Sequence, residues 1–297
     1  MTSGPRCKIF PLFNIPANSP PCIDGQSRRI EPVMDLQLEG KRALVSGSTA
    51  GIGFAIAEAL AKEGASVIVN GRTEKRVSDA LKKLQDSGVR GQLQALAADL
   101  GNADGVRRAI ELFSAVDILV NNLGIFEVKP FQEIGDDDWL RFFEVNVLSG
   151  VRLSRHYLPG MLSRNWGRIV FISSESAVQI PAEMIHYGMT KTAQLAIARG
   201  LAETTAGTKV TVNTVLPGPT ASEGASNFVR NLAEEQKTTA AAVEKEFFQN
   251  MRPTSLLKRF TTPEEVAALV AFVCSPLSAA TNGAALRADG GVVRSIL

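Results

Sequence analysis

The order of apolar and helix-forming segments predicts an α/β fold, a doubly wound parallel sheet with helices on both faces. From Leu38 to the C-terminus, short apolar runs alternate with amphipathic or charged segments, and a glycine-rich turn follows the first run directly. Apolar strands that alternate with helices form parallel sheets covered on both faces and joined by right-handed crossovers. Because there is no internal repeat and no second core pattern, we expect residues 34–297 to form one domain.

The individual elements follow from the same pattern. We expect strands at residues 43–46, 66–69, 93–97, 118–120, 168–172, 210–215 and 285–287. Helices are expected at residues 54–62, 73–85, 103–113, 136–163, 185–203, 222–232, 240–251 and 263–274. The acidic start of the long helix 136–163 suits the positive end of a helix dipole.

The composition is that of an ordinary globular protein and argues against several functional classes. The 297 residues are 45% hydrophobic and 21% charged, with a net charge of +2, which gives no electrostatic basis for binding nucleic acid or an anionic membrane. No apolar run approaches the roughly 18 residues of a membrane-spanning helix. Three widely spaced cysteines and two histidines, without a C-x-x-C motif, argue against disulfides and a zinc site. We therefore expect no metal and a reducing compartment, the cytoplasm.

Residues 1–33 differ in composition from the rest of the chain. They contain six of the fourteen prolines and show no sustained periodicity, which predicts a disordered or loosely ordered extension. Prolines interrupt the apolar run at 9–15 too early for a secretory signal. A natural start at Met34 is an equal alternative to a genuine extension.

A phosphate-binding turn is predicted at Gly47-Ser48-Thr49-Ala50-Gly51-Ile52-Gly53, between the first strand and the first helix. Glycine permits a tight turn, close approach of backbone N–H groups to a pyrophosphate, and close packing of helix on strand. The helix N-terminus adds partial positive charge. The spacing differs from G-x-G-x-x-G, and no Lys-Ser/Thr pair follows as in an NTPase loop. A flexible turn without a ligand is the alternative, which the position at the first strand–helix junction disfavours.

The end of the second strand indicates which dinucleotide binds. Asn70-Gly71-Arg72 stands where an NAD site usually places an acid for the ribose 2′-hydroxyl. A guanidinium pairs with a phosphate through a bidentate, charge-assisted fork. Asn70 and Arg72 therefore favour NADP over NAD. The alternative is that Arg72 is a solvated residue at the start of the next helix.

Tyr187 and Lys191 are the candidate catalytic pair. They lie four residues apart in a predicted helix and so share one face. An ammonium beside a phenol favours the phenolate, so we expect the pKa of Tyr187 to fall from ~10 towards neutral pH. Such a phenol can donate a proton to a carbonyl oxygen or accept one from an alcohol.

Together with further motifs in the same order, these segments resemble the short-chain dehydrogenase/reductase family in its compact single-domain form, which has a Rossmann-type fold. The resemblance runs from about Leu38 to the C-terminus. It rests on Gly47, Gly51 and Gly53, Asp99-Leu100, Asn121-Asn122-Leu123-Gly124, Asn146, Ser174, Tyr187-x-x-x-Lys191, Pro217-Gly218 with Thr220, and Asp289-Gly290-Gly291. Leu123 in place of alanine and Ser46 in place of threonine depart from the family pattern.

The resemblance implies a mechanism and a set of site residues. Tyr187 is the general acid in hydride reduction of a carbonyl, Lys191 lowers its pKa and binds the nicotinamide ribose, and Ser174 donates to the developing oxyanion. Asn146, through its backbone, is expected to hold a water that links Lys191 to solvent. Asp99 is expected to contact the adenine ring, and residues 217–220 to hold the nicotinamide. The full cofactor-binding set is Gly47, Ser48, Thr49, Gly51, Ile52, Gly53, Asn70, Arg72, Asp99, Leu100, Asn122, Gly124, Tyr187, Lys191, Pro217, Gly218 and Thr220.

Residues 220–260 are polar and helix-prone, and the resemblance implies that they form a substrate lid of two helices. We expect Arg252 and Lys258 to be exposed, and His156 and His186 to lie on helix surfaces or at the edge of the substrate site. Six apolar side chains could face the substrate or form the packing face of the lid: Phe228, Val229, Leu232, Phe247, Phe248 and Met251.

The sequence thus predicts an NADP-preferring carbonyl reductase or alcohol dehydrogenase that acts on a small molecule and, by resemblance, assembles as a homotetramer or homodimer. A 3-oxoacyl-carrier-protein reductase is the first alternative, and a basic docking patch at Arg252, Lys258 and Arg259 would support it. A regulatory protein that senses the dinucleotide without turnover is the second. Such proteins commonly lose the tyrosine or the lysine, both of which this chain keeps.

Overall fold

The computed structural model describes residues 34–296, apart from the side chains at 225, 227 and 228. From Asp35 onward the chain forms one compact unit. The predictions for residues 1–33 and for the side chain of Phe228 lie outside the described residues.

In residues 34–296, seven strands form one parallel sheet in the order β3-β2-β1-β4-β5-β6-β7. This order confirms the predicted doubly wound α/β fold of the Rossmann type. Each strand lies within two residues of the range expected from the sequence. The strands are β1 (Arg42–Val45), β2 (Ser66–Gly71), β3 (Leu93–Ala97), β4 (Ile118–Asn121), β5 (Gly167–Ile172), β6 (Val210–Pro217) and β7 (Ala285–Ala288).

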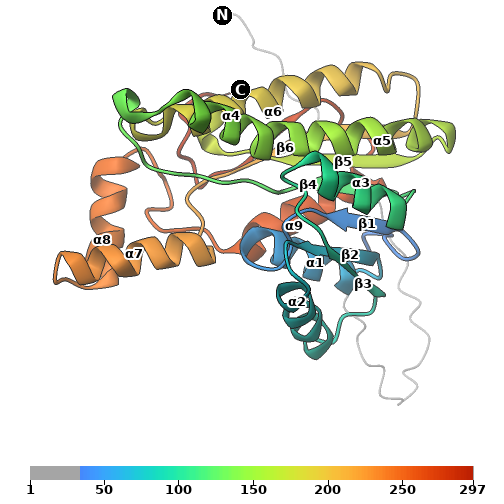
Figure 1. Ribbon diagram of the computed structural model, residues 1–297, viewed down its shortest axis with the longest axis horizontal. Coiled ribbons are helices and arrows are strands. Elements are labelled where there is room, and N and C mark those ends of the chain that lie inside the picture. The colour runs from blue at the N-terminus through green and yellow to red at the C-terminus, as the bar shows by residue number, and fades with distance from the viewer. Residues whose placement is uncertain (1–33, 297) are drawn as a thin grey trace, which may run out of the picture. The chain divides into compact units, whose positions relative to one another are not determined.

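Helices cover both faces of the sheet (Figure 1). One face carries α1 (Gly51–Lys62), α2 (Glu74–Asp86) and α9 (Pro263–Cys274), and the other carries α3 (Ala103–Leu112), α5 (Ser149–Ser163) and α6 (Ile185–Glu203). Two further helices, α7 (Glu223–Glu235) and α8 (Ala240–Glu246), stand beyond the sheet. None of the helices in the described residues has the length and hydrophobicity that crossing a membrane requires.

The core forms because strand side chains alternate between the two faces. In β1, Ala43 and Val45 join the cluster under α1 and α9, whereas Leu44 joins the cluster under α5 and α6. The other central strands alternate in the same way, and their apolar residues are almost completely buried. This two-sided burial explains why the strands appear in the sequence as continuous apolar runs.

The long helix predicted at residues 136–163 is interrupted, which corrects the expectation of one regular helix. It consists of α4 (Asp136–Phe143), a π-turn η2 (Glu144–Leu148) and α5. A π-turn inserts one extra residue into the helix and is often found at functional sites. Here it contains Asn146.

The strand order reverses direction between β1 and β4. Chain segments leaving these two strands diverge, and ligands of such sheets bind in the crevice at the carboxyl ends of the strands at that point. The glycine turn follows β1, and Asn122 follows β4. The fold therefore places both motifs at the same crevice.

Candidate dinucleotide and catalytic site

The glycine turn after β1 has a conformation that glycine alone adopts without strain. Gly47 and Gly51 have φ angles of +64° and +57°, in the left-handed region that disfavours other residues. At Gly53 the requirement is space, because a Cβ atom there would lie 2.4 Å from the Gly47 carbonyl oxygen and 2.5 Å from Asn122 Nδ2. The first turn of α1 is thus pressed against the loop, as a pyrophosphate-binding turn requires.

Hydrogen bonds from β4 hold this turn in place. Asn122 Nδ2 donates to the Ser46 carbonyl at 2.9 Å and to the Gly47 carbonyl at 3.2 Å. The Ser46 hydroxyl in turn accepts the backbone N–H groups of Asn122 and Leu123 at 2.9 and 3.0 Å. Serine therefore supplies the hydroxyl contacts at this position, where the resembled family commonly has threonine.

Two residues of the predicted cofactor set support the turn from behind. The Asn70 side chain accepts the Gly47 N–H at 2.9 Å and donates to the Leu96 and Ala98 carbonyls. Ser48 is fully buried, and its hydroxyl donates to the Val45 carbonyl and accepts the Asn70 N–H. The expectation of direct contact with a cofactor is corrected for the Ser48 hydroxyl, because these backbone contacts turn it away from the crevice.

A cleft of about 270 Å³ opens in front of the turn. Its lining contains seven of the seventeen predicted cofactor residues, namely Gly47, Thr49, Asn70, Arg72, Asp99, Leu100 and Gly124. Ile52 and Asn122 are not among the lining residues, and Ile52 packs on the core. Pro217 is buried at the end of β6, and Gly218 and Thr220 line a neighbouring cavity instead. The cleft is lined by Gly47, Thr49, Ala50, Asn70, Gly71, Arg72, Arg76, Ala98, Asp99, Leu100, Leu123, Gly124, Ile125 and Val145.

The cleft fits a dinucleotide phosphate chemically. The N-terminus of α1 lies at the cleft wall without a side-chain cap and without an acid in its first turn, so its free N–H groups favour an anion. Arg72 is exposed, and its side chain makes no hydrogen bond or ion pair with another of the described residues. Arg76, one helical turn further on, lies in the same lining. Sequence reasoning missed Arg76, although its spacing of four from Arg72 could have indicated it.

The candidate catalytic residues lie around the neighbouring cavity, which has a volume of about 170 Å³. Ser174, two residues after the end of β5, and Tyr187, in the first turn of α6, both line it. Lys191 lies one turn further along α6 and is 4% exposed. Its ammonium donates to the Ile172 carbonyl at 2.9 Å, and a Cβ on Gly124 of the cleft would lie 3.4 Å from Nζ. Lys191 therefore lies between the cleft and the cavity.

The pKa of Tyr187 corrects the expectation from the sequence. Burial raises it to about 12, and the nearby Ser174 hydroxyl offsets only part of this effect. Burial also lowers the pKa of Lys191, to about 8. Lys191 does not lower the tyrosine pKa as expected, because its Nζ lies 5.6 Å from the ring centroid and is directed to the Ile172 carbonyl. The phenol thus stays protonated at neutral pH.

Gln194 joins Asn146 to Lys191, a link that sequence reasoning missed. Its Nε2 donates to the Asn146 carbonyl at 2.6 Å, and its Oε1 lies 3.5 Å from Lys191 Nζ. The resemblance implies that the Asn146 backbone holds a water that links Lys191 to solvent, and the Gln194 amide adds a link between Asn146 and Lys191 themselves. The Asn146 side chain is engaged with the backbone of Ile125 and with the Thr190 hydroxyl. A polar residue three positions after the lysine, on its helix face, was the available signal.

The histidine expectations are only partly correct. His186 is fully buried, with its ring centroid 4.0 Å from that of Phe142, and burial lowers its pKa. It is therefore neither a surface residue nor a base beside Tyr187. His156 is partly exposed on α5, and its Nε2 lies 3.1 Å from the Ser114 carbonyl.

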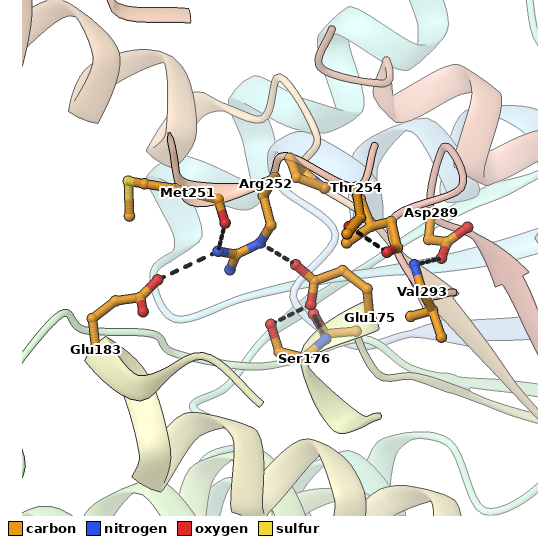
Figure 2. Close-up of polar contacts among 12 residues, drawn as sticks. Glu175, Ser176, Glu183, Met251, Arg252, Thr254, Asp289 and Val293 are labelled. Atoms are coloured by element: carbon orange, nitrogen blue, oxygen red, sulfur yellow. Dashed lines mark hydrogen bonds and ion pairs between the residues drawn. The ribbon is translucent and has the colours of Figure 1, made fainter. Parts of the chain in front are cut away.

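Arg252 is buried rather than exposed, because it forms ion pairs inside the cavity. Figure 2 shows its guanidinium between Glu175 and Glu183. Nε donates to Glu175 Oε1 at 2.7 Å, and Nη1 lies 3.4 Å from Glu183 Oε1. Glu175 directly follows Ser174 and Glu183 precedes Tyr187 by four residues, yet neither carries a sequence signal that would have revealed the pairing.

The apolar side chains of residues 220–260 serve both of the roles left open by the sequence. Val229 and Leu232 of α7 line a small space together with Phe247 and Met251, which belong to the π-turn η5 (Phe247–Met251). Phe247 and Met251 also line the catalytic cavity. Phe248 is buried and packs edge-to-face on Phe260. These helices thus have their own packing face and also form one wall of the cavity.

A cleft that fits a dinucleotide, next to a Ser–Tyr–Lys arrangement, is typical of dinucleotide-dependent oxidoreductases. Residues 41–233 match the model of the short chain dehydrogenase family. The chain is 51% identical over 263 residues to the uncharacterized oxidoreductase YvaG of Bacillus subtilis, covering 89% of this chain and all of that protein. It is 32% identical over 264 residues to the 3-oxoacyl-[acyl-carrier-protein] reductase of Aquifex aeolicus, covering 87% of this chain and all of that protein.

Solved structures agree with this assignment. L-sorbose reductase from Gluconobacter frateurii, complexed with NADPH and L-sorbose, superimposes with a TM-score of 0.83 at 30% identity, covering 89% of this chain and all of that one. The chain therefore belongs to the short-chain dehydrogenase/reductase family. It is an NAD(P)-dependent oxidoreductase.

The substitution Gly53→Ala tests the glycine turn. The added methyl group collides with the Gly47 carbonyl and Asn122 Nδ2, so we expect at least ten-fold weaker NADPH binding and a loss of about 1–3 kcal/mol in unfolding free energy. Gly200→Ala is the matched control, because Gly200 is exposed in α6 with nothing within 4 Å of its Cβ position. This control should gain up to about 1 kcal/mol. NADPH fluorescence titration and urea unfolding measure both effects, and unchanged binding by Gly53→Ala would contradict the prediction.

The substitution Lys191→Met tests the cost of burying the ammonium. The shift of the Lys191 pKa from 10.5 to about 8 corresponds to a penalty on the order of 3 kcal/mol when the group is charged in both folded and unfolded states. Below pH 8 that penalty is complete, and it declines up to pH 10.5 because the folded state then loses its proton before the unfolded state does. Without added cofactor, Lys191→Met should therefore be more stable than the unmodified protein by about 1–3 kcal/mol at pH 7.

The pH dependence separates this effect from better packing. The stability gain of Lys191→Met should shrink between pH 8 and pH 10, whereas a packing gain would not change with pH. The exposed Lys245→Met in α8 is the control and should change stability by less than about 0.5 kcal/mol at either pH. Urea unfolding at both pH values measures the gain, and a destabilised Lys191→Met at pH 7 would refute the burial argument.

Proposed function

We propose that the protein is an NADP-preferring carbonyl reductase that acts on a small molecule, with Tyr187 as proton donor. The observation that carries this proposal is the position of Tyr187. It lines a small cavity together with Ser174, and its pKa of about 12 keeps the phenol protonated at neutral pH. A protonated phenol can donate to a carbonyl oxygen, as reduction of a carbonyl requires.

In this mechanism each residue has a separate part. A bound NADPH supplies the hydride. The Ser174 hydroxyl and the Tyr187 phenol face the same cavity, where both can donate to a carbonyl oxygen and stabilise the negative charge that develops on it. Tyr187 then transfers its proton to that oxygen. Lys191 is connected through Gln194 to Asn146, and its pKa of about 8 allows it to exchange protons near neutral pH.

The preference for NADP is supported by the charges in the cleft. The guanidinium groups of Arg72 and Arg76 share the lining with the end of β2, where an NAD site usually has an acid. Among the described residues, the carboxylate partner of Arg76 is Glu223, at a distance of 3.9 Å. The NADPH bound to L-sorbose reductase and to actinorhodin polyketide ketoreductase, a second solved relative at 31% identity and a TM-score of 0.74, supports the same cofactor.

The docking patch that would favour a carrier-protein reductase has little support. Of its three candidate residues, Arg252 is buried in ion pairs with Glu175 and Glu183. Arg259 forms a two-pronged pair with Glu265. Only Lys258 keeps an exposed ammonium without a carboxylate partner within the described residues. The chain also retains Tyr187 and Lys191, which favours an enzyme over a regulatory protein that only senses the dinucleotide.

The substitution Tyr187→Phe tests the catalytic assignment. Removing the phenol hydroxyl should lower kcat by about 10²–10⁴-fold, while the affinity for NADPH changes by less than about three-fold. Tyr157→Phe is the matched control, because the other tyrosine of the chain is buried and donates to the Phe113 carbonyl. It should cost about 1 kcal/mol of stability without lowering kcat. Turnover retained by Tyr187→Phe would overturn the assignment.

The substitution Arg72→Ala tests the cofactor preference. Loss of the guanidinium should raise KM for NADPH at least ten-fold and leave KM for NADH nearly unchanged, because only NADPH carries the 2′-phosphate. Arg107→Ala on α3 is the control, since this exposed arginine pairs with Asp104 outside the cleft. Steady-state kinetics with both cofactors measure the two KM values. An equal change for NADPH and NADH would refute the role of Arg72.

A further inference from the structure

The charged side chains in the lining of the catalytic cavity are two carboxylates and one guanidinium. Glu175, Glu183 and Arg252 supply them, and Figure 2 shows them in one line with the guanidinium in the middle. The remaining lining is formed by apolar side chains and the hydroxyl-bearing residues. The apolar part includes Phe126, Phe247 and Phe260, and the hydroxyl-bearing part includes Ser174 and Tyr187.

The guanidinium of Arg252 is already paired with other groups of the protein. Its side chain is 9% exposed, Nε donates to Glu175, and Nη1 donates to the Met251 carbonyl and faces Glu183. A substrate carboxylate could gain a two-pronged pair with Arg252 only by displacing Glu175 from Nε or Glu183 from Nη1. Either displacement leaves one of the two cavity carboxylates without its counter-ion, which is unfavourable, and strongly so for the buried Glu175. Arg252 is therefore not a receptor for an anionic substrate.

The two carboxylates differ in how completely they are neutralised. The Glu175 side chain is 4% exposed, pairs with Arg252 at 2.7 Å through one oxygen, and accepts the Ser176 hydroxyl through the other. The Glu183 side chain is 31% exposed and has only the longer contact to Arg252, at 3.4 Å. Because one guanidinium balances one carboxylate, the surplus negative charge of the cavity belongs to Glu183.

We propose, building on the proposed carbonyl reductase function, that Glu183 determines substrate specificity. Its carboxylate makes the cavity select uncharged carbonyl compounds that carry a hydroxyl group, and reject those that carry a carboxylate. A carboxylate oxygen accepts a hydrogen bond from a substrate hydroxyl. A substrate carboxylate in the same cavity is repelled by that of Glu183, and a largely apolar lining screens this repulsion less than bulk water does.

Matched pairs of four- and five-carbon ketones test the two parts of this proposal. Methyl acetoacetate and acetoacetate differ in charge, and 4-hydroxy-2-butanone and 2-pentanone differ in one hydroxyl group. We measure kcat/KM with NADPH for the unmodified protein, Glu183→Gln and Glu183→Leu. Glu183→Gln removes the charge but keeps an acceptor oxygen, whereas Glu183→Leu removes both.

The expected results are changes in two ratios. In Glu183→Gln, the preference for methyl acetoacetate over acetoacetate should fall at least ten-fold relative to the unmodified protein. In Glu183→Leu, the preference for 4-hydroxy-2-butanone over 2-pentanone should fall at least five-fold. Ratios within one variant cancel any general loss of activity or stability. Glu265→Gln, which removes a carboxylate from an exposed pair outside the cavity, should leave both ratios as they are.

Two kinds of failure remain distinct. Turnover of these ketones with a charge ratio that Glu183→Gln does not change would overturn the role of Glu183 and leave the carbonyl reductase function standing. Absence of NADPH oxidation with all four ketones by the unmodified protein would overturn the reductase proposal, and the specificity proposal with it.

Discussion

The site depends on one contact, the hydrogen bonds from Asn122 Nδ2 to the backbone carbonyls of Ser46 and Gly47. They connect the carboxyl ends of β1 and β4, which are neighbours in the sheet but far apart in the sequence. The chain diverges from these two strand ends, and the two hydrogen bonds fix the distance between them at the base of the crevice. On this fixed base, α1 packs so closely against the glycine turn that position 53 has no room for a side chain.

Burial, more than attraction between charges, sets the proton affinities of Tyr187 and Lys191. The same removal from water raises the pKa of the Tyr187 phenol and lowers that of the Lys191 amine, because in each case the charged form loses solvation. The Lys191 ammonium regains part of its lost solvation by donating a hydrogen bond to the Ile172 carbonyl rather than to the phenol. The site therefore holds a proton donor at the cavity and a readily deprotonated amine behind it, at a cost in folding stability.

Local patterns in the sequence predicted the fold and the position of Tyr187 and Lys191 on one helix, but not the contacts made across the chain. Alternating apolar runs placed every strand, and the spacing of Tyr187 and Lys191 placed both on one helix face. The pairing of Arg252 with Glu175 joins residues 77 positions apart, and no periodicity records such a contact. The direction of the Tyr187 pKa shift was wrong for a related reason, because burial depends on what the whole chain packs around the ring.

Because of the π-turn that carries Asn146, the number of residues between α4 and α5 determines how the two helices are rotated relative to each other. Deleting one residue from Glu144–Leu148 would restore a regular α-helix and rotate α4 by about 100° relative to α5. Phe142 would then turn away from His186, and the Asn146 amide would leave Thr190. Making a helix regular is a common way to stabilise a protein, but here it would remove the contacts that hold α6 in place. Variation among related chains is therefore expected to change the side chains of this turn and to preserve its residue count.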